Sequence, residues 1–122
     1  MKKMIPLGLL WLGLIIAAPS LLAADISVKD GDSIQAAVNQ ASTGDVILVH
    51  PGTYKESVYV DKDGITIRGV VVEGEWPVMD GEGILNDAIL YSGNDFTVEW
   101  LTITRYKGNA VMGQAGNNFV IR

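Results

Sequence analysis

The sequence predicts an all-β fold, a parallel β-solenoid whose first coil is closed by an α-helix. Three observations support this prediction. Short strand-like segments recur with related sequences, as in ITIR at residues 65–68, FTVE at 96–99 and FVIR at 119–122. Glycine, asparagine and aspartate, which favour turns, separate these segments. Only one segment of the chain has the apolar spacing of an amphipathic helix.

The N-terminal segment, from Met1 to Ala24, has the layout of a secretory signal peptide. Two lysines give a positive start, the stretch from Met4 to Ala18 is mostly apolar, and Ala23 and Ala24 offer a cleavage site. A retained N-terminal membrane anchor is the alternative, because the apolar stretch is nearly long enough to span a bilayer. We therefore expect a secreted or periplasmic protein whose mature part is one domain, residues 25–122.

The mature part contains seven basic and fourteen acidic residues, a formal net charge of −7, and no cysteine. An acidic surface repels phosphate groups, so nucleic acid is excluded as a partner. The same surface repels an acidic polysaccharide unless basic residues cluster locally or a divalent cation bridges the two. Without disulfides, stability has to come from packing and backbone hydrogen bonds.

Residues 32–42, DSIQAAVNQAS, are predicted as the helix. One narrow apolar stripe lies at helical spacing and consists of Ile34, Ala37, Val38 and Ala41. We expect Asp32 to cap the first turn, Gln35 to complete a pair like a capping box, and Gly44 to end the helix. A solenoid needs such a cap because its terminal coil exposes core and strand edges.

After Gly44 the pattern changes to strands. DVILV at residues 45–49 predicts a buried strand. In the following HPGTY, Pro51 and Gly52 suit the central positions of a type II turn. Short alternating segments then follow at residues 57–60 (SVYV), 65–69 (ITIRG), 96–100 (FTVEW), 101–104 (LTIT) and 119–122 (FVIR).

These segments align as repeated units of variable length, which is typical of solenoids. A shift of 31 in the numbering superimposes ITIR on FTVE, and a shift of 23 superimposes FTVE on FVIR. A second row aligns residues 58–60, 88–90 and 110–112, and at the first shift Val70 and Val72 align with Leu101 and Ile103. Each unit then has a strand, a turn with Asn or Asp, a second strand, a one-residue corner and a third strand. The glycine- and acid-rich residues 73–86 are interpreted as a loop that absorbs the longer interval.

Strands that recur one unit later can pair in parallel with their own copies, each coil about 4.8 Å above the last. Hairpins are the alternative, but they require two-residue turns and pairing between sequence neighbours. A leucine-rich horseshoe fits less well because no helix recurs. The prediction places Phe96 buried directly beside Phe119. It also expects further coils beyond Arg122, which ends a strand without a cap; the alternative is a second copy covering that end.

A family resemblance follows from these segments. IQAAVNQA, GDVILVHPGTYKESV and GITIRG, with the later NDFTVEWLTIT and GNNFVIR, resemble the first coils of secreted proteins of the pectate-lyase-like superfamily. The resemblance covers residues 27–122 and includes the NosD-like, carbohydrate-binding and sugar-hydrolysing branches. It implies a right-handed parallel β-helix and export. It leaves the activity open, since this architecture hosts lyases, hydrolases, esterases, epimerases and non-catalytic modules.

The resemblance also implies where catalysis would occur. Polysaccharide-processing members place acidic and basic residues on middle coils, which here would lie beyond Arg122. Pectin methylesterases share the PGTYKE-like opening and carry a QAV segment. Here the comparable stretch at residues 109–111 is Asn-Ala-Val, without the glutamine. No catalytic residue is therefore assigned.

Alternation along the strands places Arg68, Glu99 and Arg122 in one outward-facing column. This column is interpreted either as a polar groove that binds a sugar chain or as a surface ion-pair ladder, which adjacent strands favour. Trp76, in the predicted loop, is the best candidate for an exposed aromatic side chain that contacts a sugar ring. These four residues are the candidate substrate-binding residues. Trp100 is expected at a corner.

Cofactor chemistry has little support in the sequence. Oxygen ligands for a calcium ion are available, but the spacing matches no calcium-loop motif, so solvated loop carboxylates are the preferred interpretation of Asp80, Glu82, Asp87 and Asp95. His50, the only histidine, has no second histidine or cysteine with which to form a metal site or a catalytic triad. Asn94 and Asn117, at equivalent turn positions, are expected to stack their side-chain amides.

Two functions remain open from the sequence. The first is an exported β-helix that binds or modifies a polysaccharide as a lyase, hydrolase or epimerase. The second is a non-catalytic periplasmic repeat module, such as a NosD-like assembly factor or a scaffold fused to another domain.

Overall fold

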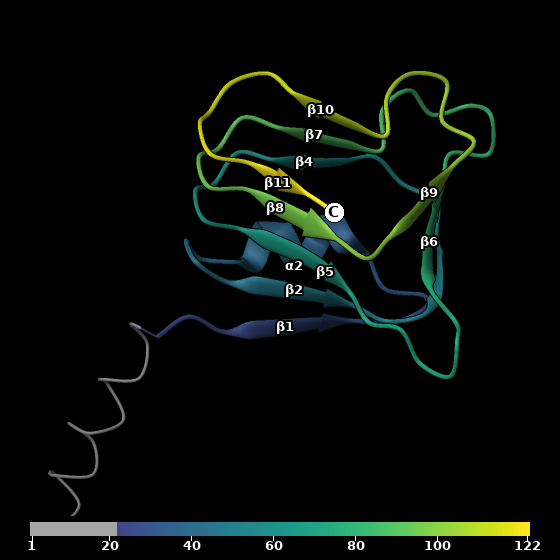
Figure 1. Cartoon of the computed structure of the whole chain (residues 1–122). Coiled ribbons are helices and arrows are strands. Elements are labelled where there is room, and N and C mark those ends of the chain that lie inside the picture. The colour runs from purple at the N-terminus through teal and green to yellow at the C-terminus, as the bar shows by residue number, and fades with distance from the viewer. Residues whose placement is uncertain (1–21) are drawn as a thin grey trace, which may run out of the picture.

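The computed structural model describes residues 22–122 as a parallel β-solenoid of about four turns with a single short helix (Figure 1). This architecture confirms the predicted fold class. The predicted signal peptide lies outside the described residues except for residues 22–24. Within the described part, no helix is long and apolar enough to cross a membrane.

Three parallel sheets run along the solenoid, and each is named here after its first strand. The β1 sheet contains, in spatial order, β1 (Asp25–Val28), β2 (Val46–Val49), β5 (Thr66–Gly69), β8 (Thr97–Glu99) and β11 (Val120–Ile121). The β3 sheet contains β3 (Gly52–Tyr54), β6 (Pro77–Asp80) and β9 (Thr102–Thr104). The β4 sheet contains β4 (Val58–Val60), β7 (Ile89–Tyr91) and β10 (Val111–Gly113).

The register of the β1 sheet confirms the predicted repeat. Thr66 pairs with Thr97, and Thr97 pairs with Val120, which reproduces both shifts that superimpose the three sequence segments. In the β4 sheet the prediction is wrong by one residue, because Val58 pairs with Ile89 and not with Ala88. Since side chains alternate between faces, this difference places Ile89 in the core and turns Leu90 outward.

The core occupies the space between the three sheets. Inward-facing aliphatic residues of successive coils stack on one another, as Ile47, Ile67 and Val98 do in the β1 sheet. The ring of Tyr91 stacks on that of Phe96 with centroids 4.8 Å apart. Burial of each such large apolar side chain stabilises the fold by about 1.5–3 kcal/mol.

The helix is α2 (Ile34–Gln40), shorter than the predicted 32–42, and its apolar stripe is buried as predicted. Its N-cap is Ser33, whose hydroxyl accepts the Ala36 N–H at 3.1 Å. The prediction that Asp32 caps the helix is therefore wrong. The helix ends at an extended Ala41, and the left-handed Gly44 (φ +92°) belongs to the turn that follows.

Side chains from the second coil bind both ends of α2. The Glu56 carboxylate accepts the backbone N–H groups of Ile34 at 2.8 Å and Gln35 at 3.0 Å. The Lys62 ammonium donates to the carbonyls of three residues at the C-terminal end, Val38, Asn39 and Ala41. The first N–H groups and the last C=O groups of a helix have no partner within the helix. A negative charge at the N-terminal end and a positive charge at the C-terminal end are therefore both stabilising.

Gln35 closes the open edge of β4. Its side-chain oxygen accepts the Tyr59 N–H at 2.6 Å, and its amide nitrogen donates to the Tyr59 carbonyl at 3.1 Å. The side chain thus makes the two hydrogen bonds that a neighbouring strand would make. The predicted closing of the first coil by the helix is confirmed, although Gln35 acts on a strand edge and not in a capping box.

Three strands, β1, β3 and β6, were not predicted. The interpretation of residues 73–86 as a loop is wrong for its middle part, because β6 lies there and pairs with β9. Ile103 therefore lies beside Met79, and the predicted alignment of Val72 with Ile103 is wrong. The loop before β6 is therefore shorter than predicted, and an isolated antiparallel bridge joins Val72 to Glu75 across it.

The predicted type II turn at Pro51 and Gly52 is also wrong. Gly52 begins β3 and does not have the positive φ that this turn requires. Glycine is needed there for a different reason, because a Cβ atom would lie 2.7 Å from the Asp30 carboxylate oxygen Oδ1. A close approach between coils, and not a turn, explains this glycine.

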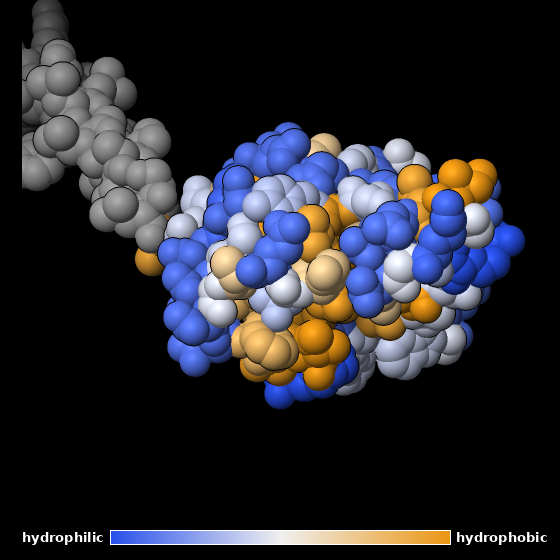
Figure 2. Space-filling model, turned by 90° about the horizontal axis from the view of Figure 1, so that it is seen from above, coloured by the Kyte–Doolittle hydropathy of each residue, from blue (hydrophilic) through white to orange (hydrophobic). Residues whose placement is uncertain are grey.

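The opposite end of the solenoid exposes apolar side chains. Phe119 occupies the same position as Phe96 one coil later, since the Val120 N–H donates to the Phe96 carbonyl at 2.9 Å. Phe96 is fully buried, whereas Phe119 is 57% exposed. The prediction that the two lie side by side is confirmed, but the expected burial holds only for Phe96. Figure 2 looks onto this end and shows apolar side chains in the middle of the face with hydrophilic residues around them.

Candidate functional site

The predicted column of charged residues exists on the outer face of the β1 sheet. Arg68 and Glu99 are paired in the parallel register, and Arg122 follows Ile121, the partner of Val98. The Glu99 carboxylate accepts the Nε–H of Arg68 at 2.6 Å through Oε2 and that of Arg122 at 2.8 Å through Oε1. The interpretation as an ion-pair ladder is therefore correct as a description of the geometry.

Glu99 is held as an anion. Its side chain is only 7% exposed although it lies on the outer face. Hydrogen bonds from Arg122 and then Arg68 hold its pKa below the usual 4.5, despite the opposing effect of burial. A carboxylate that is ionised at neutral pH, with both oxygens occupied, is poorly suited to act as a general acid. With two guanidinium groups and one carboxylate, the column carries a net positive charge.

Trp100 forms the corner between β8 and β9, as predicted. Its backbone is left-handed (φ +62°), which is uncommon for a bulky residue. Gly69 makes this corner possible, because a Cβ atom at Gly69 would lie 1.7 Å from the Trp100 carbonyl oxygen. The corner leaves the Trp100 side chain 54% exposed, beside the charged column.

Trp76, from the loop before β6, lies next to Trp100. The two ring centroids are 6.2 Å apart and the planes are inclined by 31°. Trp76 is 45% exposed, as the sequence predicted. Sequence reasoning did not foresee the pairing with Trp100, because the segment between the two includes a strand that was not predicted.

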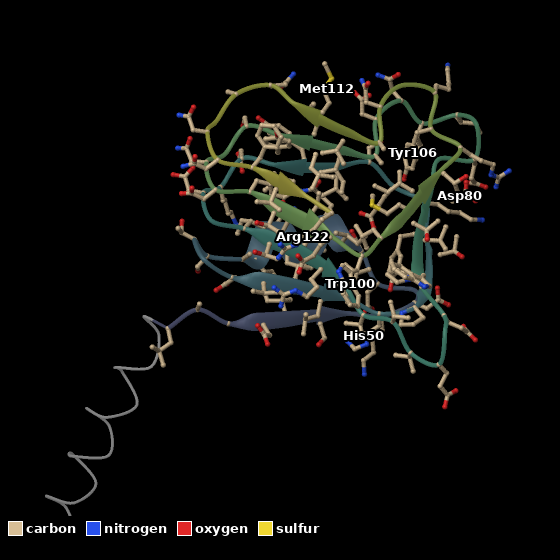
Figure 3. The ribbon with its side chains drawn as sticks, in the orientation of Figure 1. His50, Asp80, Trp100, Tyr106, Met112 and Arg122 are labelled. Atoms are coloured by element: carbon tan, nitrogen blue, oxygen red, sulfur yellow. The ribbon has the colours of Figure 1, made fainter. Side chains whose placement is uncertain are left out.

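A groove of about 510 Å³ connects these features. It is lined by Arg68, Gly69, Val70, Val71, Glu99, Trp100 and Arg122. Figure 3 shows Arg122 and Trp100 on the same face of the molecule. Three of the four predicted binding residues thus line one groove, and the fourth, Trp76, flanks it through its contact with Trp100.

The groove combines donors with an apolar surface. Arg68 and Arg122 each use Nε to bind Glu99, and their terminal guanidinium nitrogens make no hydrogen bond to another described residue. Their side chains are 46% and 70% exposed. These nitrogens can donate to hydroxyl or carboxylate oxygens of a ligand while the indole faces contact its apolar parts.

The acidic residues of the third coil are not all solvated. Asp80 ends β6 with a side chain only 12% exposed, and Arg105 donates to both its oxygens, from Nε at 2.9 Å and Nη2 at 2.6 Å. The hydrogen bonds from Arg105 lower the Asp80 pKa. The interpretation as a solvated carboxylate is therefore wrong for Asp80. Within residues 22–122, no group of three His, Cys, Asp or Glu side chains is placed to bind a metal.

The turns carry a ladder of short polar side chains. The Asn94 N–H donates to Asp63 at 2.8 Å, and the Asn117 N–H donates to the Asn94 side-chain oxygen at 2.9 Å. The predicted equivalence of Asn94 and Asn117 is confirmed, but the contact runs from side chain to backbone and not between amides. His50 follows β2, and its Nε2 is buried without a hydrogen-bond partner among residues 22–122.

Comparisons with protein-family models, with curated proteins and with solved structures gave no match.

Proposed function

We propose that this protein is an exported β-helix of the pectate-lyase-like kind that binds a polysaccharide in the groove beside Trp100. The observation that carries the proposal is the pair of half-exposed indoles, Trp76 and Trp100, next to the outward-facing guanidinium groups of Arg68 and Arg122. Sugar rings present apolar faces and many hydroxyl groups, and this combination matches both.

The geometry favours binding over chemistry at this place. Glu99 is fixed between two arginines and holds its charge, so it positions their side chains and neither donates nor accepts a proton readily. The parallel strands keep Arg68 and Arg122 two coils apart along the solenoid axis. Such a row of donors suits an extended polymer that runs along the axis.

The charge distribution supports acidic over neutral sugars. The mature part carries a net charge of −7, which opposes the approach of a polyanion over long distances. Arg68 and Arg122 outnumber Glu99 in the groove and can each bind a carboxylate with two parallel hydrogen bonds. Binding of uronate-containing chains should therefore strengthen with added salt at first, as long-range repulsion is screened, and weaken at high salt.

Tryptophan fluorescence tests the proposal directly. Trp76 and Trp100 are the only tryptophans outside the predicted signal peptide, so the emission of the processed protein reports on the groove. Titration with neutral and uronate oligosaccharides should change this emission. Loss of one stacking indole should weaken binding by roughly 2- to 10-fold in Trp100→Ala.

Tyr59→Phe is the matched control, because Tyr59 lies on the outer face of the β4 sheet and does not line the groove. It should bind glycans like the unmodified protein. If the unmodified protein binds neither neutral nor acidic glycans, the proposal is wrong. The alternative from the sequence, a non-catalytic periplasmic module of the NosD-like or scaffold type, would then be favoured.

A further inference from the structure

The β4 sheet has a hollow of about 250 Å³ between its strands β4 and β7. The hollow is lined by Ser57, Val58, Tyr59, Asn86, Asp87 and Leu90. The fold continues on both sides of it, because Gln35 of α2 binds the lower edge of β4 and β10 pairs with β7 from above (Figure 1). The hollow therefore belongs to the middle of the sheet, and it shares no lining residue with the groove beside Trp100.

Asp87 brings to this hollow a carboxylate that no described cation neutralises. Its Oδ1 accepts the backbone N–H of Asn109 at 2.7 Å and the side-chain amide of Asn109 at 3.1 Å. Its Oδ2 accepts only the Asn86 side-chain amide, at a long 3.4 Å. Within residues 22–122, Asp87 forms no ion pair, whereas Asp80 and Glu99 both bind arginine. Neutral donors therefore fix this carboxylate in place and leave it able to bind a cation.

Tyr59 supplies a fixed aromatic surface to the same hollow. Gln35 binds its backbone N–H and C=O, and its hydroxyl oxygen lies 2.9 Å from that of Ser92. The residue is held at both ends, and it is 42% exposed on the outer face of the sheet. The face of a tyrosine ring attracts a cation that lies within about 6 Å of the ring centre. Leu90, the partner of Tyr59 in the parallel register, adds an apolar surface.

The charge around the hollow also favours a cation. Residues 73–99, which include three of its lining residues, contain seven acidic residues and no basic one. Residues 25–122 carry a formal net charge of −7, and such a field raises the local concentration of cations. A metal ion fits poorly, because within residues 22–122 no group of three His, Cys, Asp or Glu side chains is placed to bind one. One carboxylate beside an aromatic ring suits an organic cation.

We propose that this hollow binds a primary alkylammonium group. The ammonium donates a charge-assisted hydrogen bond to Oδ2 of Asp87 and contacts the Tyr59 ring, and the alkyl chain lies against Leu90. The volume of about 250 Å³ is below the range of roughly 300–1,000 Å³ that is typical of sites for whole ligands. The hollow therefore takes the aminoalkyl end of a molecule, which a free diamine and a lysine side chain both present.

A matched pair of small molecules tests this proposal. n-Butylamine carries an ammonium group, and n-butanol has the same carbon chain without the charge. In titrations of isotope-labelled protein followed by NMR, n-butylamine should shift the amide resonances of Asn109 and Tyr59. It should bind at least about fivefold more tightly than n-butanol, because only the amine adds a charge-assisted hydrogen bond and a cation–π contact. Putrescine and an N-acetylated lysine amide then distinguish the two sources of the group, and tighter binding of either one identifies the source.

Substitutions separate the hollow from a general attraction of cations to an acidic protein. Asp87→Asn keeps an oxygen for the N–H of Asn109 but removes the charge, and should weaken n-butylamine binding by about tenfold. Asp63→Asn is the matched control, because Asp63 also accepts a backbone N–H from the next coil, that of Asn94 at 2.8 Å, and lies outside the hollow. It changes the net charge equally and should leave binding unchanged. Tyr59→Leu should weaken binding by about two- to fivefold through loss of the cation–π contact.

Equal binding of n-butylamine and n-butanol, or no binding of the amine, would overturn the proposal. Equal weakening in Asp87→Asn and Asp63→Asn would also overturn it, because only the net charge would then matter. Circular dichroism checks that the variants are folded. If Asp87→Asn does not fold, Tyr59→Leu decides, and unchanged binding in that variant overturns the proposal. Trp100→Ala should leave amine binding unchanged, so a failure of the glycan proposal is distinguishable from a failure here.

Discussion

The two ends of the described solenoid differ in how their strand edges and apolar side chains are covered. At the N-terminal end, Glu56 and Lys62 bind the ends of α2, and Gln35 satisfies the edge of β4. At the other end, the β11 edge has no neighbour among the described residues and Phe119 is largely exposed. The contrast shows that burial in a solenoid depends on the adjoining layer, because each coil contacts only its neighbours.

The largest expected effect compares the two equivalent phenylalanines. Phe96→Ala should lower the free energy of unfolding by about 3–5 kcal/mol, because it leaves a cavity beside Tyr91 between two coils. Phe119→Ala should cost less than about 1 kcal/mol, because most of that ring already contacts water. Urea unfolding followed by circular dichroism measures both. Equal losses would show that Phe119 is covered by a further layer in solution.

The next effect concerns the clamp on α2, which is the pair of side chains, Glu56 and Lys62, that bind the two ends of the helix. Glu56→Ala removes the acceptor of two backbone N–H groups and of the Ser33 hydroxyl, and should cost about 1.5–3 kcal/mol. Glu56→Gln, the matched control, keeps one acceptor oxygen and should cost less. Hydrogen exchange should show the loss of protection concentrated in α2 and at Tyr59. A loss spread evenly over all coils would contradict the view that this clamp acts locally.

The fold could be predicted from the sequence. The set of residues that form the groove could be predicted only in part. Arg68, Glu99 and Arg122 were predictable together because a fixed repeat offset and the alternation of side chains determine a column. The contact between Trp76 and Trp100 was not, because it depends on β6, whose PVMD sequence has no clear alternation. The pairing of Asp80 with Arg105 was missed for the same reason.

The clamp was missed for a different reason. Glu56 and Lys62 lie in turns beside β4, where charged residues are usually solvated, and no local pattern connects them with a helix one coil earlier. For Gly52 as well, the local sequence did not reveal a contact with another coil. Its sequence context indicated a turn, whereas the close approach of Asp30 from the preceding coil determines the residue.

Acid should destabilise the fold at both ends of the solenoid. The pKa values of Asp45, Asp80 and Glu99 are lowered by hydrogen bonds in the folded state. As the pH falls, the unfolded chain takes up protons first, so stability is present above the usual values of 3.8 and 4.5 and is lost as the pH falls through the lower folded values. Unfolding free energies measured from pH 7 to 2 check this.

Single substitutions separate the two ends in that titration. Asp45→Asn removes a group that binds the N–H groups of Ala24 and Ser42 at the capped end. Glu99→Gln removes the group between Arg68 and Arg122 near the open end. Each should make the stability less dependent on pH below 4.5. An unchanged acid dependence in both variants would contradict the assignment of these groups.

Alkali should destabilise the protein through two tyrosines. Burial is the main cause that raises the pKa of Tyr54 and of Tyr106 from 10.0 to about 12. The unfolded chain loses these protons first, so stability is lost as the pH rises from 10 towards 12. Tyr106→Phe should reduce this loss, and phenolate absorbance should rise together with unfolding. Half-ionisation of Tyr54 and Tyr106 at pH 10 in folded protein would contradict the prediction, because that is the behaviour of an unburied tyrosine.

The smallest effect is expected in the middle of the solenoid, away from both ends. Lys55 and Glu82 form an ion pair at 3.5 Å with side chains 55% and 44% exposed. Lys55→Gln should change the free energy of unfolding by less than about 0.5 kcal/mol, because solvent screens the pair and ordering two long side chains opposes it. Arg105→Gln is the matched comparison, since it breaks a two-point contact with the largely buried Asp80 and should cost clearly more. Equal effects in urea unfolding would mean that exposure, which distinguishes the two ends of the solenoid, does not determine the strength of its ion pairs.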